Sequence, residues 1–140
     1  MPNEQLENLV KIRQLKAEPA SKEEIAGLLR SGVARLEDSK NEALNMESRF
    51  DLAYNAAHAL SLGALRAAGF RSENRYLVFQ CTQHTLNVEP EQWRVLDQAH
   101  RKRNLAEYEG DIDVDDKLLE ALIRVVDLIA DRLRELDDDY

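Results

Sequence analysis

The chain has 140 residues, of which 44% are hydrophobic and 33% charged, with five Gly, three Pro and a formal net charge of −8. This length predicts one domain, and a composition rich in Ala, Leu, Glu and Arg but poor in strand-favouring residues predicts an all-α protein. No apolar run reaches the roughly 18 residues of a membrane span, and the N-terminus lacks the pattern of a signal peptide. Cys81 is the single cysteine, so we expect a cytoplasmic protein in which this thiol is a small buried hydrophobe.

The charge is distributed unevenly along the chain. Residues 1–108 carry 15 acidic and 15 basic side chains, whereas residues 109–140 carry 12 acidic and 4 basic ones. A neutral body argues against non-specific nucleic-acid binding, which needs a broad basic surface. The basic island at Arg101, Lys102 and Arg103 still allows RNA to bind at a small site.

The N-terminal part of the chain predicts two helices. Residues 3–15 have the apolar spacing of a short helix, and the proline-containing segment 17–20 ends it. A longer helix is expected over 21–44. Ser21 and Glu24 have the spacing of a capping box, in which each side chain accepts a hydrogen bond from a backbone N–H of the other residue.

The middle of the chain predicts a buried helix and a shorter one. Residues 48–69 are apolar almost all round, which places this helix at the centre of a bundle, with Gly69 as its C-terminal stop. His58 lies within it and is expected in the core or at the edge of the packing. Residues 74–86 form the shorter helix, and His84 is expected at its C-terminal end.

The C-terminal third predicts two more long helices, over 90–108 and 115–136, followed by a frayed acidic tail over 137–140. The whole chain, 1–140, is therefore expected to be one all-α domain. Its core, about 21–136, is predicted to be an antiparallel up-down four-helix bundle with short additional helices.

The acidic loop before the last helix resembles the start of a calcium site. Asp111, Asp113 and Asp115 alternate as such ligands do, but Asp116 and Leu122 stand where a calcium loop needs Gly and Glu. An N-cap with further carboxylates in the first turn explains the run. No metal and no other cofactor is expected.

One face of the 90–108 helix carries polar residues at helical spacing. These are His100, Arg103, Asn104, Glu107 and Tyr108, and Trp93 and Leu96 continue the same side toward the N-terminus. The same spacing is equally typical of a helix whose last two turns are exposed to solvent. The mixed apolar and polar surface predicts a two-fold homodimer through this face.

The Arg103-Asn104 dipeptide near the end of a penultimate helix, followed by a polar ring at Tyr108, resembles the motif of the HEPN superfamily. The resemblance covers about residues 21–136 and includes the Ala-rich central helix and a closing amphipathic helix. It implies an up-down four-helix bundle that pairs as a homodimer. Many members are metal-independent ribonucleases of toxin–antitoxin and other defence systems. Others are inactive and bind RNA or nucleotide, or pair with a nucleotidyltransferase.

The resemblance implies that Arg103 and Asn104 bind RNA or phosphate, with Arg101 and Lys102 beside them. The histidine of the family would fall at Tyr108, so this chain departs from the motif there. RNA cleavage needs a group that moves a proton near pH 7, which suits imidazole, with a pKa of about 6.5. A phenol, with a pKa of about 10, is a poor base, although it can donate a hydrogen bond.

Three functions are expected from the resemblance and from these residues. The first is a HEPN-like RNA- or nucleotide-binding module that is catalytically weak or inactive and acts in a toxin–antitoxin or defence system, with an antitoxin or nucleotidyltransferase as partner. The second is an active metal-independent ribonuclease that uses Arg103 with Tyr108 or with His100, one turn upstream; a two-fold dimer could bring His100 of one chain to Arg103 of the other. The third is a structural protein whose Arg103–Tyr108 face is a dimer interface.

Overall fold

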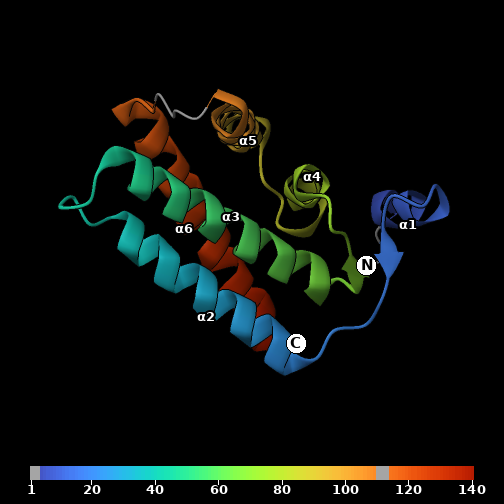
Figure 1. Ribbon diagram of the computed structural model, residues 1–140. Coiled ribbons are helices and arrows are strands. Elements are labelled where there is room, and N and C mark those ends of the chain that lie inside the picture. The colour runs from blue at the N-terminus through green and yellow to red at the C-terminus, as the bar shows by residue number, and fades with distance from the viewer. Residues whose placement is uncertain (1–3, 110–113) are drawn as a thin grey trace.

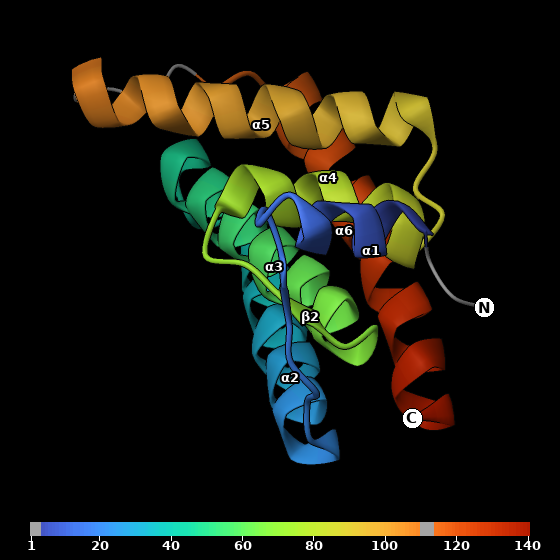
Figure 2. The ribbon, with the colours of Figure 1, turned by 90° about the vertical axis from the view of Figure 1, so that its right-hand side faces the viewer.

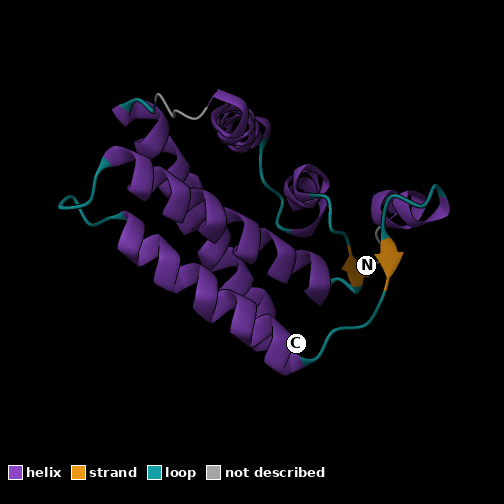
Figure 3. Ribbon diagram, in the orientation of Figure 1, coloured by secondary structure: helices purple, strands orange, loops and turns teal. Residues whose placement is uncertain are grey.

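The computed structural model describes the backbone of residues 4–109 and 114–140 and the side chains of 4–105 and 114–140. The protein is mostly helical, as predicted, and the six expected helices are present together with one small strand pair (Figure 3). In chain order the elements are α1 (Glu4–Lys11), β1 (Lys16–Ala17), α2 (Lys22–Ser39), α3 (Met46–Ala67), β2 (Phe70–Arg71), α4 (Arg75–Thr85), α5 (Pro90–Glu109) and α6 (Asp116–Asp139).

Three long helices, α2, α3 and α6, run side by side and pack on one another (Figure 1). Helices α4 and α5 are seen end-on in that view, and Figure 2 shows that α5 runs across the three. The up-down arrangement of four helices is therefore not confirmed. The crossing brings the C-terminal half of α5 over the N-terminal half of α3.

Helix α3 occupies the centre of the fold, as its nearly all-apolar sequence predicts. Eleven of its 22 residues are buried. It packs against α2 on one side and α6 on the other, and a glycine lies at each of these contacts. A Cβ on Gly32 of α2 would lie 2.5 Å from Leu60, and a Cβ on Gly63 of α3 would lie 2.9 Å from Leu133. The three helices therefore approach one another as closely as they do because these positions lack a side chain.

Four helices, α2, α3, α4 and α6, begin after a short polar side chain that caps them, and α3 begins at Met46, two residues before the expected start. The side-chain oxygens of Asn45, Asn74 and Asp115 accept hydrogen bonds from the backbone N–H groups three residues on. This confirms the N-cap interpretation of Asp115, whereas Asp111 and Asp113 lie outside the described residues. Gly69, with φ of 93°, follows the end of α3, as a glycine just beyond a C-cap does.

The predicted capping box at the start of α2 is only half formed. The Ser21 hydroxyl accepts from the Glu24 N–H at 3.1 Å, as expected. The Glu24 carboxylate instead accepts two hydrogen bonds from Arg66, at 2.7 and 3.2 Å. A charged partner on α3 thus replaces the local backbone partner, and this partner could not be seen from local spacing.

Two helix ends differ from the prediction. Helix α2 ends at Ser39 and not near residue 44, because the segment that follows turns: the side-chain oxygen of Asn41 accepts from the Ala43 N–H. The C-terminal residues are not a frayed tail. Helix α6 continues to Asp139, and the Tyr140 hydroxyl donates to the carbonyl of Ala20.

The strand pair was not predicted. β1 and β2 are antiparallel, with Lys16 opposite Arg71 and Ala17 opposite Phe70, and they hold the segment after α1 beside the end of α3. Cys81 is buried as expected, and burial raises the pKa of its thiol to about 11. Among the helices described, none is long and apolar enough to cross a bilayer.

Candidate functional site

The N-terminal half of α5 packs on its own protomer. Leu96 and Ala99 are each 1% exposed. Trp93 is partly buried and lies edge-on to Tyr76, with ring centroids 5.6 Å apart. Trp93 and Leu96 therefore do not form the exposed apolar patch from which a dimer interface was expected. The homodimer remains a proposal without support from these two residues.

His100 lies inward from the polar face of α5, within a set of aromatic rings. Its ring centroid is 6.2 Å from that of Tyr54, 5.1 Å from that of Tyr76 and 5.9 Å from that of Phe79. Its Nδ1 is 3.0 Å from the Tyr54 hydroxyl, and its Nε2 is 3.1 Å from Nδ2 of Asn104. Both ring nitrogens of His100 therefore lie within hydrogen-bond distance of a polar group, and the tautomer decides which nitrogen donates.

Arg103 reaches the same tyrosine from one turn further along α5. Its guanidinium carbon lies 5.7 Å from the centroid of the Tyr54 ring, and one terminal nitrogen lies 3.2 Å from the Asp51 carboxylate. The side chain is 27% exposed, yet its Nε is buried and has no hydrogen-bond partner among the residues described. Arg103, His100, Asn104, Tyr54 and Asp51 together form what we call the Arg103 cluster.

The other predicted basic residues lie differently. Arg101 is bound through its Nε to both carboxylate oxygens of Asp97, at 3.1 and 3.2 Å, and this hydrogen bond raises the pKa of the guanidinium. Lys102 is partly buried. Tyr108 falls within α5, but its side chain lies outside the described residues. The structure thus brings Arg103, His100 and Asn104 together and directs Arg101 to Asp97.

Two members of the Arg103 cluster were missed from the sequence, because both come from α3. Tyr54 belongs to the helix that was expected to be buried, and it is indeed 2% exposed, but its hydroxyl lies 3.0 Å from Nδ1 of His100. Asp51 had no predicted role. The available signal was the line of Asp51, Asn55 and His58, which are spaced four and three residues apart and so share one face of a helix that is otherwise nearly all apolar.

Arg75, at the start of α4, also lies beside the Arg103 cluster. Its guanidinium carbon also lies 5.7 Å from the Tyr54 centroid, and its terminal nitrogen donates to the Asn55 side chain at 3.3 Å. Tyr54 therefore lies near two guanidinium groups, one from α4 and one from α5. The two guanidinium groups place positive charge on both the α4 and the α5 side of the ring, and the Asp51 carboxylate offsets part of it.

His58 lies further along the same face of α3. It is partly buried and lies edge-on to Phe79 at 6.1 Å, as expected for a histidine at the edge of the packing. Burial, with a further contribution from the positive charge of Arg75, lowers the pKa of His58 to about 4. The ring is therefore neutral at pH 7.

The lowered pKa of His58 predicts a loss of stability in acid. The unfolded chain keeps the ordinary value of 6.5, so it takes up a proton before the folded protein does as the pH falls from 6.5 toward 4. Above that window both states are neutral and His58 contributes no pH dependence. Between about pH 7.5 and pH 4.5, we expect the wild type to lose about 1–2 kcal/mol more than His58→Gln, measured by urea unfolding.

The exposed His84 provides the matched control, because His84→Gln removes a histidine from α4. This variant should lose stability in acid as the wild type does. If His58→Gln and the wild type lose equal stability between the two pH values, His58 is not held neutral by the fold.

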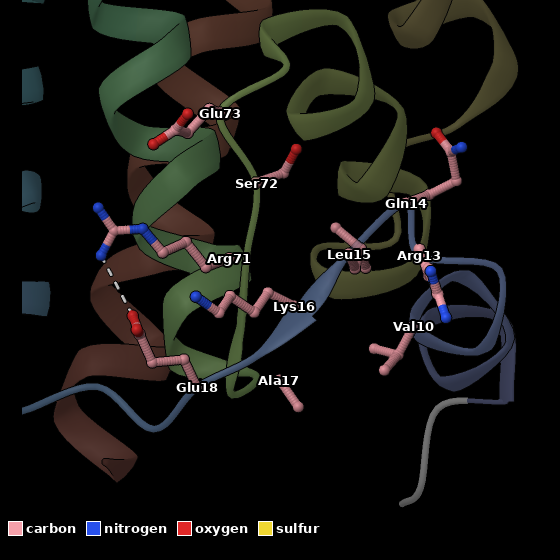
Figure 4. Close-up of a pocket in the computed structure, with 10 residues that line it drawn as sticks. All are labelled: Val10, Arg13, Gln14, Leu15, Lys16, Ala17, Glu18, Arg71, Ser72 and Glu73. Atoms are coloured by element: carbon pink, nitrogen blue, oxygen red, sulfur yellow. Dashed lines mark hydrogen bonds and ion pairs between the residues drawn. The ribbon is translucent and has the colours of Figure 1, made fainter.

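A wide cavity lies on another side of the molecule, between the turn after α1 and the segment that follows β2. Its volume is about 770 Å³, and none of its lining residues belongs to α5 (Figure 4). Arg71 and Glu73 extend to one side of the segment after β2 and Ser72 to the other, and Arg71 donates to Glu18 at 3.1 Å. This cavity is therefore separate from the Arg103 cluster.

The described residues form a mostly helical protein in which a polar cluster lies between α5 and α3. Within the described ranges, no group of three or more His, Cys, Asp or Glu residues could hold a metal ion. No family model matches the chain, and neither a curated protein nor a solved structure matches it.

Proposed function

We propose that this chain is a HEPN-like module that binds RNA or a nucleotide through Arg103 and lacks efficient cleavage. One observation carries the proposal: Arg103 is held by Asp51 at 3.2 Å and over Tyr54 at 5.7 Å, beside His100, while its side chain remains 27% exposed. A guanidinium oriented in this way can bind a phosphate oxygen without first losing side-chain freedom. The crossing of α5 departs from an up-down bundle, so the support comes from the cluster and not from the helix arrangement.

The surroundings of His100 support binding rather than turnover. Both ring nitrogens are within hydrogen-bond distance of partners in the same protomer, the Tyr54 hydroxyl and the Asn104 amide. A general base needs an accepting nitrogen that faces the substrate hydroxyl. To act as a base, His100 would first have to exchange one of these two partners. The tyrosine at position 108, where the motif has histidine, also favours binding over cleavage, because a phenol is a poor base at pH 7.

The wider biological setting is part of the same proposal. A HEPN-like module of this kind would work in the cytoplasm as a homodimer, in a toxin–antitoxin or defence system, with an antitoxin or nucleotidyltransferase as partner. An active ribonuclease that uses Arg103 with Tyr108 or His100 is the alternative, and RNA fragmentation on expression would distinguish it from a binding module.

A structural role is the second candidate, and the ion pair between Arg103 and Asp51 favours it. This pair joins the crossing helix α5 to the central helix α3. If that were its only purpose, Arg103→Ala would lower stability and leave ligand binding unaffected. Because the Asp51 side chain is 45% exposed and Arg103 27%, we expect the pair to contribute at most about 1 kcal/mol to stability.

Binding of a fluorescein-labelled single-stranded RNA, followed by fluorescence anisotropy, tests the proposal. We expect Arg103→Ala to weaken binding by about tenfold or more, because a hydrogen-bonded charge pair with phosphate is lost. Binding should also weaken as salt is raised, since phosphate contacts release counterions. Arg94→Ala is the matched control, because Arg94 is exposed on the same helix and carries the same charge.

Equal binding by the wild type and both variants would contradict the proposal. Loss of binding in Arg94→Ala as large as in Arg103→Ala would show a response to net charge and not to the cluster. Robust cleavage by the wild type that disappears in Tyr108→Phe would establish the ribonuclease instead.

A further inference from the structure

A second polar cavity lies beside the first turn of α4, between α3, the start of α2 and the segment after β2. Its volume is about 330 Å³, at the lower end of the range for small-molecule sites. Its charged and titratable lining residues are His58, Arg66, Arg71, Arg75, Glu24 and Glu73. We call it the His58 cavity. Three arginines from three elements thus face one small volume in a protein whose net charge is −8.

The three arginines are not equivalent. Arg66 is 3% exposed and donates both to the Glu24 carboxylate and to backbone carbonyls, so Arg66 and Glu24 neutralise each other within the wall. Arg71 is 51% exposed and pairs with Glu18 at 3.1 Å. Arg75 is exposed and donates a hydrogen bond to the neutral side chain of Asn55. Arg75 and Arg71 can therefore reorient toward a ligand, whereas Arg66 cannot.

The remaining lining residues suit a small ligand with one charged end. His58 is neutral at pH 7 and presents a polar ring at the α3 wall. Leu28 and Leu62 form the apolar part of the lining. Glu73 is exposed and adds one negative charge, which opposes an anion. An anion in the cavity would meet Arg71, Arg75 and His58, and Glu73 would weaken its binding.

We propose that the His58 cavity binds a small phosphate monoester, with Arg71, Arg75 and His58 as ligands of the phosphoryl group and Leu28 and Leu62 against the body of the molecule. A phosphate monoester carries nearly two negative charges at pH 7 and three acceptor oxygens, which matches a cavity lined by Arg71, Arg75 and His58 from three elements. The volume accommodates one small molecule and not a length of RNA. The proposal does not use Arg103 and stands without the RNA-binding function.

Binding at this cavity should be coupled to protonation of His58. The charged groups that line the cavity with His58 are Arg75, Arg71, Arg66, Glu24 and Glu73, and Phe79 lies edge-to-face with its ring. A bound dianion would offset the positive charge of Arg75, which contributes to the low pKa of His58. We therefore expect the NMR titration of His58 to move to higher pH when the ligand is bound.

Calorimetry with inorganic phosphate and with AMP at about pH 7 tests the proposal on the full chain. We expect Arg75→Gln to weaken binding about tenfold and Glu73→Gln to tighten it about threefold, because the two changes remove opposite charges from one cavity. Arg94→Gln, exposed on α5, should leave the affinity unchanged. Tighter binding of AMP than of phosphate would assign a nucleotide, and equal binding would assign the phosphoryl group alone; either result supports the site.

The proposal would be overturned if neither inorganic phosphate nor AMP saturates the protein at millimolar concentration. An equal loss in Arg94→Gln would also overturn it, because that loss would show a net-charge effect. Loss of AMP binding in Arg103→Ala with none in Arg75→Gln would place the ligand at the Arg103 cluster, which would overturn this site and support the RNA- or nucleotide-binding function.

Discussion

Replacing Arg66 with alanine is expected to lower the free energy of unfolding by about 3–5 kcal/mol. The side chain is 3% exposed, and it joins α3 to the segment before α2 and to β2. Its nitrogens donate to the Glu24 carboxylate at 2.7 and 3.2 Å and to the carbonyls of Glu18, Pro19 and Phe70. Removal leaves these acceptors without a donor and empties a buried volume, so the cost exceeds that of a surface ion pair.

Arg71→Ala is the matched control for this prediction. Arg71 is in the neighbouring strand and binds Glu18, but it is 51% exposed, so its loss should cost less than about 1 kcal/mol. The two variants can be compared by urea unfolding monitored by circular dichroism. A similar, small loss in both would show that Arg66 does not hold these segments together.

The ion pair between Arg66 and Glu24 predicts that acid lowers the stability of the fold. The hydrogen bond from Arg66 lowers the pKa of Glu24 below its usual 4.5. The stabilisation from Glu24 is therefore complete above that usual value and is lost as the pH falls through the lowered pKa. The Arg66→Ala variant should therefore lack this part of the loss of stability in acid.

Gly32→Ala is expected to have the second large effect, a net loss of about 2 kcal/mol. The added Cβ would lie 2.5 Å from Cγ and Cδ2 of Leu60, in the contact between α2 and α3. Leu60 is fully buried, so it can move only by displacing its neighbours. Overpacking of this kind costs about 3 kcal/mol, and the better helix propensity of alanine returns about 1 kcal/mol.

Gly27→Ala, in the same helix, separates these two contributions. A Cβ there would meet only the end of the Arg30 side chain, at 3.8 Å. We expect this variant to be more stable than the wild type by about 0.5–1 kcal/mol, because the propensity gain is not opposed. Thermal and urea unfolding of both variants would check the contrast. A Gly32→Ala protein as stable as Gly27→Ala would mean that α2 and α3 are not in close contact.

The polar face of α3 connects the two proposed sites. Asp51 and Tyr54 belong to the Arg103 cluster, His58 lines the second cavity, and Asn55 binds Arg75 between them. Arg75 lies over Tyr54 and also lines the second cavity. Occupation of the cavity would draw Arg75 toward its ligand, so the RNA affinity of the Arg103 cluster should be measured with and without AMP.

The secondary structure could be predicted from the sequence because its signals are local. The helix start at Asn74, the cap at Asp115 and the stop at Gly69 depend on residues within one helical turn, whereas the cap at Asn45 was not predicted. The end of α2 was misplaced because the turn after Ser39 contains no proline or glycine. The tail was misassigned because its contacts, from Asp137 to Lys22 and from Tyr140 to Ala20, span the length of the chain.

The candidate site could be predicted only in part, for the same reason. Helical spacing correctly placed His100, Arg103 and Asn104 together, because they are neighbours on one helix. It could not reveal that Tyr54 and Asp51 of α3 complete the cluster, or that Arg101 pairs with Asp97. It also placed Leu96 at a mixed surface, although α4 and the core cover it.

The sequence by itself determined the helical class, the central position of α3 and the polar residues of α5, because hydrophobic periodicity reports which face of a helix is buried. Only the tertiary structure decided that α5 crosses the other long helices. Crossing angles depend on how the side-chain ridges of two helices fit together, as where Gly32 admits Leu60, and no single helix carries that information. The crossing is what sets Arg103 against Asp51 and His100 against Tyr54, so the site exists through contacts between helices and not through a motif alone.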